Sequence, residues 1–154
     1  MSQCYRSGDF KKYFDENMQD LGLPVPTTLF DTYQTAIGTV TTLVGALGTL
    51  GKGATMAELI GATVVLEKLT VAAAIGASAY TGAAIGSIAV ASGRALGCGT
   101  RMADVFAFTD RHNLKFKGDM SFYALNPQIL NGSHFARSSF GLRARVSPSS
   151  FEYA

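Results

Sequence analysis

The sequence predicts an all-α protein: a helical hairpin bundle with an Ala/Gly-rich apolar centre and a loosely structured basic C-terminal tail. Residues 32–51 and 69–93 are two long stretches without a charged side chain, and both have helical patterning. Residues 1–31 hold three Lys/Arg and five Asp/Glu, whereas residues 99–154 hold seven and four. The chain of 154 residues is the size of a single domain, 1–154.

Residues 7–22 predict a short amphipathic helix, capped by Ser7 or Asp9 and ended by Gly22. Its polar face is acidic rather than lysine-rich, which disfavours a role on a membrane surface. We therefore expect this helix to cover the apolar centre. Its apolar face consists of Phe10, Tyr13, Phe14, Met18 and Leu21.

A second helix is predicted from Thr27 or Thr28 to about Leu50. Apolar side chains follow one face and threonines follow the opposite one, so the helix is amphipathic through hydroxyl groups rather than charges. One interpretation is that these hydroxyls line a wet lumen where fixed charge is costly, with Thr35, Thr39 and Thr42 as candidate pore-lining residues. The alternative is that the threonines bond to the carbonyls of their own helix or form an ordinary polar surface.

A third helix is predicted to begin at a capping box, Thr55-Met-Ala-Glu58, after a tight turn at residues 51–54. This arrangement predicts an antiparallel hairpin with Lys52 at its tip, within an uncharged helical region that extends over residues 27–97. Since the third element would be about forty residues long, we expect a break near Glu67-Lys68 or near Tyr80-Thr81-Gly82.

The 25 uncharged residues 69–93 are long enough, as a helix, to cross a bilayer core of roughly 30 Å. Ala74, Ser78, Gly82 and Gly86 form a row of small residues at spacing four, a glycine zipper, which lets helix backbones approach closely in lipid. The segment is weakly hydrophobic, because nine Ala, four Gly, three Ser and two Thr contribute little transfer energy. Such a segment suits a chain that is soluble before it enters a bilayer. The alternative is an Ala/Gly-rich hairpin packed inside a soluble domain.

The tail, residues 99–154, is predicted to contain a short amphipathic helix at 102–113, after a turn at 97–99. From Lys115 onward the turn residues indicate irregular structure with one weak hairpin. Three arginines lie in this flexible part beside phenylalanines, a composition compatible with RNA, with anionic lipid or with a solubilising tail. They are Arg137, Arg143 and Arg145.

Nothing in the sequence indicates an enzyme, a cofactor or a metal site. The stretch Gly45–Gly53 is similar to a phosphate-binding loop, but its glycine spacing is wrong and Gly53 stands where a Mg²⁺-binding hydroxyl is needed. His112 and His134 lack ligands at metal spacing. Asp104 and Asp110 fall on different faces of the predicted helix, which disfavours a catalytic carboxylate pair.

The first residues lack the basic and apolar regions of a secretory signal, so we expect synthesis in the cytoplasm and export without a signal peptide. Two cysteines, Cys4 and Cys98, are too few for a disulfide scaffold. Both are interpreted as structural or incidental, and a single bridge between them after export stays open.

The uncharged helical hairpin and the Ala74-Ser78-Gly82-Gly86 zipper, within residues 32–97, resemble the small membrane-depolarising effectors that bacteria deliver into rivals through the type VI secretion system. The resemblance implies a secreted antibacterial toxin that inserts from the periplasm into the inner membrane of the recipient, self-associates and forms small ion-conducting pores. It implies two protein partners, a carrier in the secretion tube and a cognate immunity protein, and no nucleic acid. Two alternatives are a holin-like or resident small membrane protein and a soluble helical binding module.

Overall fold

The computed structural model describes residues 10–26, 29–50, 54–62, 69, 73–96, 102–114, 119–131, 137 and 139–146. The fold is all-α, as the sequence predicts. The elements are α1 (Phe10–Asp20), α2 (Tyr33–Leu50), α3 (Met56–Ala62), α4 (Ala77–Leu96), α5 (Met102–Arg111), α6 (Asp119–Leu125), the 3-10 helix η2 (Pro127–Ile129) and α7 (Ser139–Val146).

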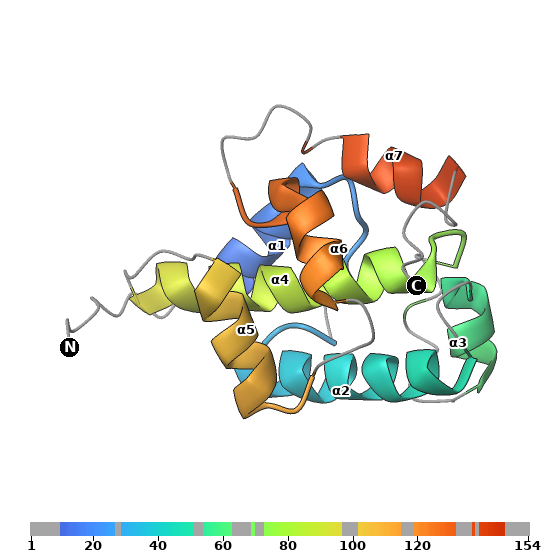
Figure 1. Cartoon of the computed structure of the whole chain (residues 1–154), viewed down its shortest axis with the longest axis horizontal. Helices are drawn as coiled ribbons and strands as arrows, with labels where there is room; N and C mark the ends of the chain where they lie inside the picture. Colours follow the sequence, from blue (N-terminus) through green and yellow to red (C-terminus); the bar gives the residue numbers. More distant parts are fainter. Residues whose placement is uncertain are drawn as a thin grey trace.

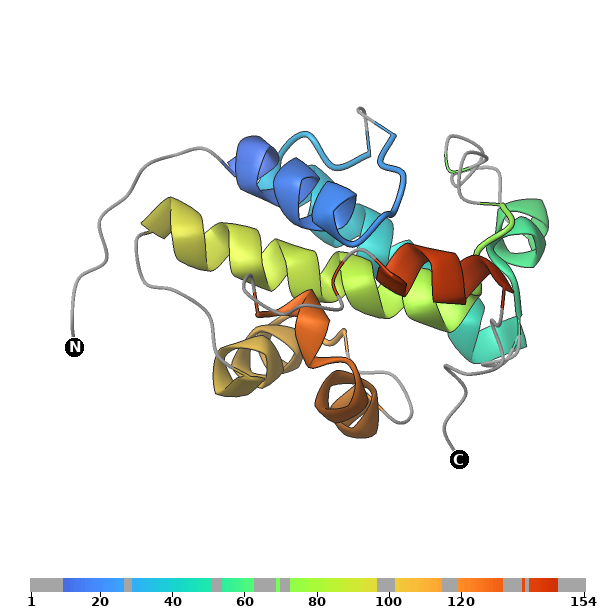
Figure 2. The same cartoon turned by 90° about the horizontal axis from the view of Figure 1, so that it is seen from above.

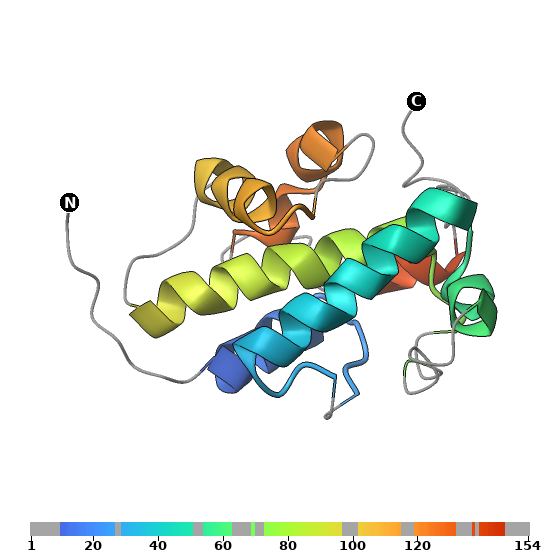
Figure 3. The same ribbon diagram turned by 90° about the horizontal axis from the view of Figure 1, so that it is seen from below.

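Helix α4 is the axis around which the other elements pack (Figure 1). Helices α1 and α2 both run in the opposite direction to α4, with α1 alongside it in Figure 2 and α2 crossing it obliquely in Figure 3. Helices α5 and α6 lie on the other side of α4 from α1. Helix α4, whose one charged residue is Arg94, is therefore surrounded by the other helices.

Helix α1 covers α4, as its aromatic face predicts. It ends in a Schellman motif: Leu23 N–H donates to Met18 O at 3.0 Å, Gly22 N–H donates to Gln19 O at 2.9 Å, and Gly22 has a φ of 76°. Phe14 stacks on Phe30 with ring centroids 4.7 Å apart, so the connection to α2 packs against α1 as well. The predicted caps at residues 7 and 9 lie outside the described residues.

Helix α2 begins at Tyr33, later than the start at residue 27 or 28 that the sequence predicts. The Thr32 hydroxyl accepts a hydrogen bond from the Thr35 amide at 3.1 Å and caps the helix. Several threonines in this segment could serve as the N-cap of the helix, and the local sequence pattern does not show which of them does. Residues 27 and 28 lie outside the described residues.

One of the two bonds of the predicted capping box of α3 is present, with the Thr55 amide donating to Glu58 Oε1 at 3.1 Å, while the Glu58 amide donates to Thr55 O. The third predicted element is divided, as its length predicts, since α3 ends at Ala62 and α4 begins at Ala77. Helix α4, rather than α3, runs antiparallel along α2 (Figure 1). Residues 51–53 and the predicted break at 67–68 lie outside the described residues.

Residues 73–76 form a turn that fastens α4 to α3. Ala73 O and Ile75 O accept hydrogen bonds from the first amides of α3, at 3.1 and 2.8 Å, and Thr55 pairs with Gly76 in an antiparallel bridge. The second predicted break, at residues 80–82, is wrong because these residues are inside α4. Ala74 is exposed in the turn, so the predicted four-residue zipper has three members on the helix.

The C-terminal tail is more ordered than predicted. The helix expected at 102–113 is observed as α5, but α6, η2 and α7 occupy positions where irregular structure was expected. Helix α7 approaches the end of α1 closely: Gly141 N–H donates to Leu21 O at 2.7 Å, and a Cβ at Gly141 would lie 2.6 Å from the Gly22 carbonyl carbon. Glycine is needed at position 141 because two backbones meet there.

Candidate functional site

The candidate site is the central helix α4 together with the residues that cover it. Every residue from Ala77 to Ala91 is buried, and no charged residue occurs in α4 before Arg94. Most of these residues are alanine, glycine or serine, which project little side-chain volume. Neighbouring elements can therefore approach the α4 backbone closely.

The glycine face of α4 is filled by aromatic and aliphatic side chains from the C-terminal region. A Cβ at Gly82 would lie 2.5 Å from Cζ of Phe122, and a Cβ at Gly86 would lie 2.6 Å from Cγ2 of Ile129. The Tyr123 hydroxyl donates a hydrogen bond to Gly82 O at 2.8 Å. Two of the three predicted zipper residues on α4 thus receive side chains of the same chain. We call residues 119–129, which supply these side chains, the cover segment.

The remaining predicted zipper residue on the helix, Ser78, is also buried. Tyr80, on another face of α4, is buried and donates a hydrogen bond from its hydroxyl to Pro24 O at 3.0 Å. Burial raises the pKa of Tyr80 far above its ordinary value, so this phenol remains neutral and keeps its donor. This contact joins α4 to the segment that follows α1.

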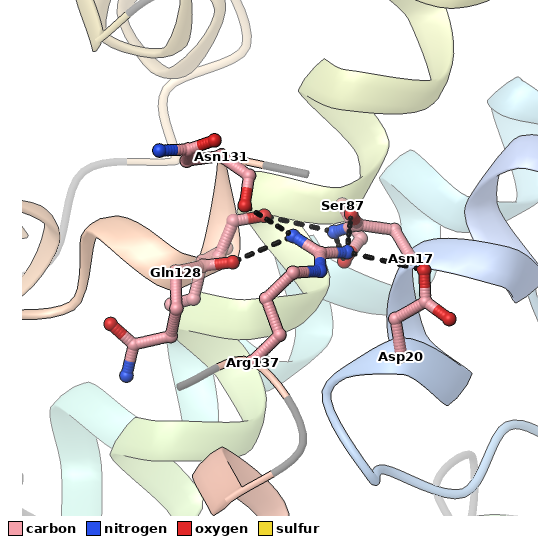
Figure 4. Close-up of polar contacts among 7 residues, drawn as sticks. Asn17, Asp20, Ser87, Gln128, Asn131 and Arg137 are labelled. Carbon is pink, nitrogen blue, oxygen red and sulfur yellow. Dashed lines mark hydrogen bonds and ion pairs between the residues drawn. The ribbon is translucent and has the colours of Figure 1, made fainter. Parts of the chain in front are cut away.

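A buried polar network joins α1, α4 and η2 (Figure 4). Asn17 Nδ2 on α1 donates to Ser87 Oγ on α4 at 2.9 Å and to Ile129 O at 3.0 Å. Arg137 Nη2 donates to the Asn17 oxygen at 2.5 Å. One amide side chain therefore links three parts of the molecule that are distant in sequence.

Arg137 completes this network from the C-terminal side. Its Nη1 donates to Gln128 O at 2.7 Å and to Asn131 O at 3.1 Å, and its Nη2 lies 3.6 Å from the Asp20 carboxylate (Figure 4). Arg137 is only 6% exposed, so the expectation of a solvated arginine in a flexible tail is wrong at this position. A buried guanidinium is costly unless its donors are satisfied, and here backbone carbonyls and an amide oxygen supply most of the acceptors.

The three candidate pore-lining threonines do not share one environment. Thr35 is exposed, Thr42 is partly buried and donates to Gly38 O at 3.1 Å, and Thr39 is buried. The Thr39 hydroxyl lies within reach of both Thr35 O, at 3.0 Å, and Leu29 O, at 2.8 Å. The threonine hydroxyls of α2 bond mainly to carbonyls of their own helix, which is the alternative that the sequence left open.

His112 is one of the two imidazoles and lies at the end of α5, against the start of α2. Its Nε2 is 2.8 Å from the Tyr33 hydroxyl, and both rings pack beside Phe108. Burial and the neighbouring Arg111 charge lower the pKa of His112. Burial raises the pKa of Tyr33, which the Arg111 charge partly offsets. The pair joins α2 to α5 in its neutral state.

The other sequence candidates do not form a site in the described part of the chain. Gly45 and Gly48 of the loop-like stretch lie inside α2, and Asp110 is exposed on α5. The described residues contain no group of three or more His, Cys, Asp and Glu side chains that could hold a metal ion. Cys4, Cys98, His134 and the side chains of Asp104 and Arg145 lie outside the described residues.

None of the helices in the described part of the chain combines the length and the hydrophobicity needed to cross a membrane.

Two features of the site are absent from the sequence-based prediction: the cover segment and the Arg137 network. Asn17 and Ser87 are 70 positions apart, and Asn17 and Arg137 are 120 apart. Periodicity and capping rules concern residues within a turn or two of each other, so they give no signal for such pairs. The only local signal was the aromatic pair Phe122-Tyr123 in a short apolar patch.

No protein-family model, curated protein or solved structure matches this chain.

Proposed function

We propose that this chain is a pore-forming antibacterial effector that carries its membrane-active helix in a covered form. It would be made in the cytoplasm, travel in a secretion tube with a carrier, and be neutralised in the producer by an immunity protein. In the recipient it would insert into the inner membrane from the periplasm, self-associate and dissipate the membrane potential.

The observation that carries this proposal is the placement of α4. A helix whose first seventeen residues, Ala77–Gly93, lack charge is covered by α1, α2, α5, α6 and η2. Its small-residue face has the pattern that supports close helix packing in lipid, where the hydrophobic effect no longer drives association. A covered apolar helix is what a chain needs if it is to be soluble in transit and enter a bilayer afterwards.

Insertion would require two rearrangements of the observed form. The covering helices would have to leave α4, and the turn at residues 73–76 would have to become helical so that α4 extends toward Leu69. The extended segment 69–93 would then exceed the roughly 30 Å thickness of a bilayer core, because a helix rises about 1.5 Å per residue. In the assembled pore, the hydroxyls of Thr35, Thr39 and Thr42 would face the lumen instead of their own helix carbonyls.

The proposal predicts that toxicity depends on the side of the membrane that the chain reaches. Cells that make it in the cytosol should tolerate it, whereas cells that export it with an added Sec signal should lose membrane potential without lysis. A voltage-sensitive dye and a lysis marker, followed together in time, measure both. Equal toxicity from the two compartments, or lysis before depolarisation, would contradict the proposal.

A soluble helical binding module is the second candidate. It is favoured by the filled glycine face, since Phe122 and Ile129 give Gly82 and Gly86 a packing role within the monomer. Potassium release from vesicles separates the two candidates. A binding module releases none at any protein concentration, and the pore former releases it in a dose-dependent way.

A further inference from the structure

The cover segment occupies the face of α4 that a second helix would use. Phe122 and Ile129 fill the space over Gly82 and Gly86, and Tyr123 bonds to the Gly82 carbonyl. The principal packing neighbours of α6 and η2 are α4 and each other. Removal of the cover segment would therefore expose the glycine face. It would also break the ring contact of Tyr123 with Phe106 on α5 and the hydrogen bond that Arg143 on α7 donates to Asn126.

Arg137 is the strongest polar tie on this segment. It bonds to Gln128 O and Asn131 O, on either side of the end of η2, and to Asn17, which in turn bonds to Ile129 O and to Ser87. These bonds tie η2 to α1 and α4 (Figure 4).

We propose that the cover segment is an autoinhibitory contact and that Arg137 is the latch that keeps it on α4 until the chain reaches a membrane. This inference rests on the proposed pore function, because the face that is covered is the one through which α4 would self-associate. With the cover segment in place, a second α4 is excluded by side chains that already contact the glycine positions.

The network makes opening cooperative. Its hydrogen bonds share the side chains of Asn17 and Arg137, so displacement of either side chain breaks several bonds at once. A buried donor or acceptor that is left without a partner is costly. Partial lifting of η2 is thus disfavoured, and the covered and open forms are separated as two states. A membrane shifts this equilibrium by binding the open form in preference to the covered one.

The test compares Arg137→Met with the control Arg111→Met, which removes the same charge from an exposed position on α5. Met keeps much of the length of the side chain but donates no hydrogen bond. Amide hydrogen exchange in water is measured for the cover segment and α4, and potassium efflux is measured from vesicles of phosphatidylethanolamine and phosphatidylglycerol. We expect Arg137→Met to raise the opening equilibrium by roughly a hundredfold and to speed efflux, since it removes one partner of a buried charged network. The control should match the parent.

A second variant, Tyr123→Phe, preserves packing and removes the hydrogen bond to Gly82 O. Loss of one bond should raise opening by about fivefold. If Arg137→Met does not fold, Tyr123→Phe alone tests whether the cover segment is held on α4. Unchanged exchange over the cover segment in the folded variants would overturn the latch.

The two proposals fail in different ways. If exchange rises as expected but neither the parent nor any variant releases potassium, the latch is supported as a structural device and the pore function is wrong. If the parent releases potassium and the folded latch variants release it no faster, the pore function stands and the autoinhibitory role is wrong.

Discussion

Helices α2 and α4 are both rich in glycine, alanine and hydroxyl side chains, yet their glycines have opposite surroundings. On α2, Gly38, Gly45 and Gly48 are exposed, and a Cβ at any of them would meet nothing within 4 Å. On α4, a Cβ at Gly82 or Gly86 would collide with a side chain of the cover segment. Composition alone makes the two helices look alike, whereas packing makes glycine necessary in one and not in the other.

The comparison separates two reasons for a small residue in a helix. Glycine lowers helix propensity by about 1 kcal/mol relative to alanine, so it needs a compensating contact. On α4 that contact is visible inside the monomer. No contact within the monomer accounts for the α2 glycines, and the structure offers no explanation for them.

The largest expected effect comes from changing one glycine on each helix to the same residue. Gly82→Leu forces a branched side chain into the space that Phe122 fills, and should lower the free energy of unfolding by about 1 to 3 kcal/mol. Gly45→Leu places the same side chain in solvent on a helix and should not lower it. Urea titration of both variants measures the difference. Equal free energies of unfolding for the two variants would show that Phe122 does not pack tightly against Gly82.

The double variant, Gly82→Leu with Gly86→Leu, tests the role of the same glycine face in the membrane-inserted form that we propose. The double variant should bind vesicles at least as well as the parent, because the segment becomes more hydrophobic. It should lose oligomers and ion leakage, because large side chains separate the helix axes. A folded double variant that binds vesicles and conducts like the parent would contradict the role assigned to the glycine face.

A smaller effect is expected from the hydroxyls of α2. Replacing Thr35, Thr39 and Thr42 together by valine removes the donor to Leu29 O, at a cost of about 1 kcal/mol, and keeps the helix shape. If the hydroxyls line the lumen, ion flux through vesicles should fall while membrane binding persists. Unchanged flux would place the lumen elsewhere, with Ser78 and Ser87 as the next candidates.

The smallest effect concerns the contact between α2 and α5. Because the pKa of His112 is lowered in the folded state, the unfolded chain takes up this proton first as pH falls below the ordinary histidine value of about 6.5. The folded state should therefore be most stable above that pH and lose stability below it. In His112→Gln this component of the pH dependence should be absent, as measured by thermal unfolding between about pH 7.5 and about pH 5, a range that extends at least about one unit on either side of the ordinary histidine pKa. An unchanged pH profile would assign the effect to other groups.

The sequence predicted those features that depend on neighbouring residues. The Thr55–Glu58 capping box, the end of α1 at Gly22 and the helix at α5 each follow from contacts within about one helical turn. The all-α class follows from the same local patterns.

The features that were missed depend on distant residues. Arg137 was expected in solvent because its acceptors come from α1 and η2, which no local pattern brings together. The start of α4 at Ala77 was also missed, because it directly follows the pairing of Gly76 with Thr55, which is distant in sequence. The identity of Gly82 as a packing position could be predicted, but not the side chain that packs on it.

The proposed function requires that the covering elements leave α4 when the chain meets a membrane. Hydrogen exchange, measured on the same sample with and without vesicles of phosphatidylethanolamine and phosphatidylglycerol while potassium efflux is recorded, tests it most directly. Vesicles should make α1 and the cover segment exchange rapidly, leave α4 protected, and cause potassium release on the same timescale. Efflux with the cover segment still fully protected would contradict it.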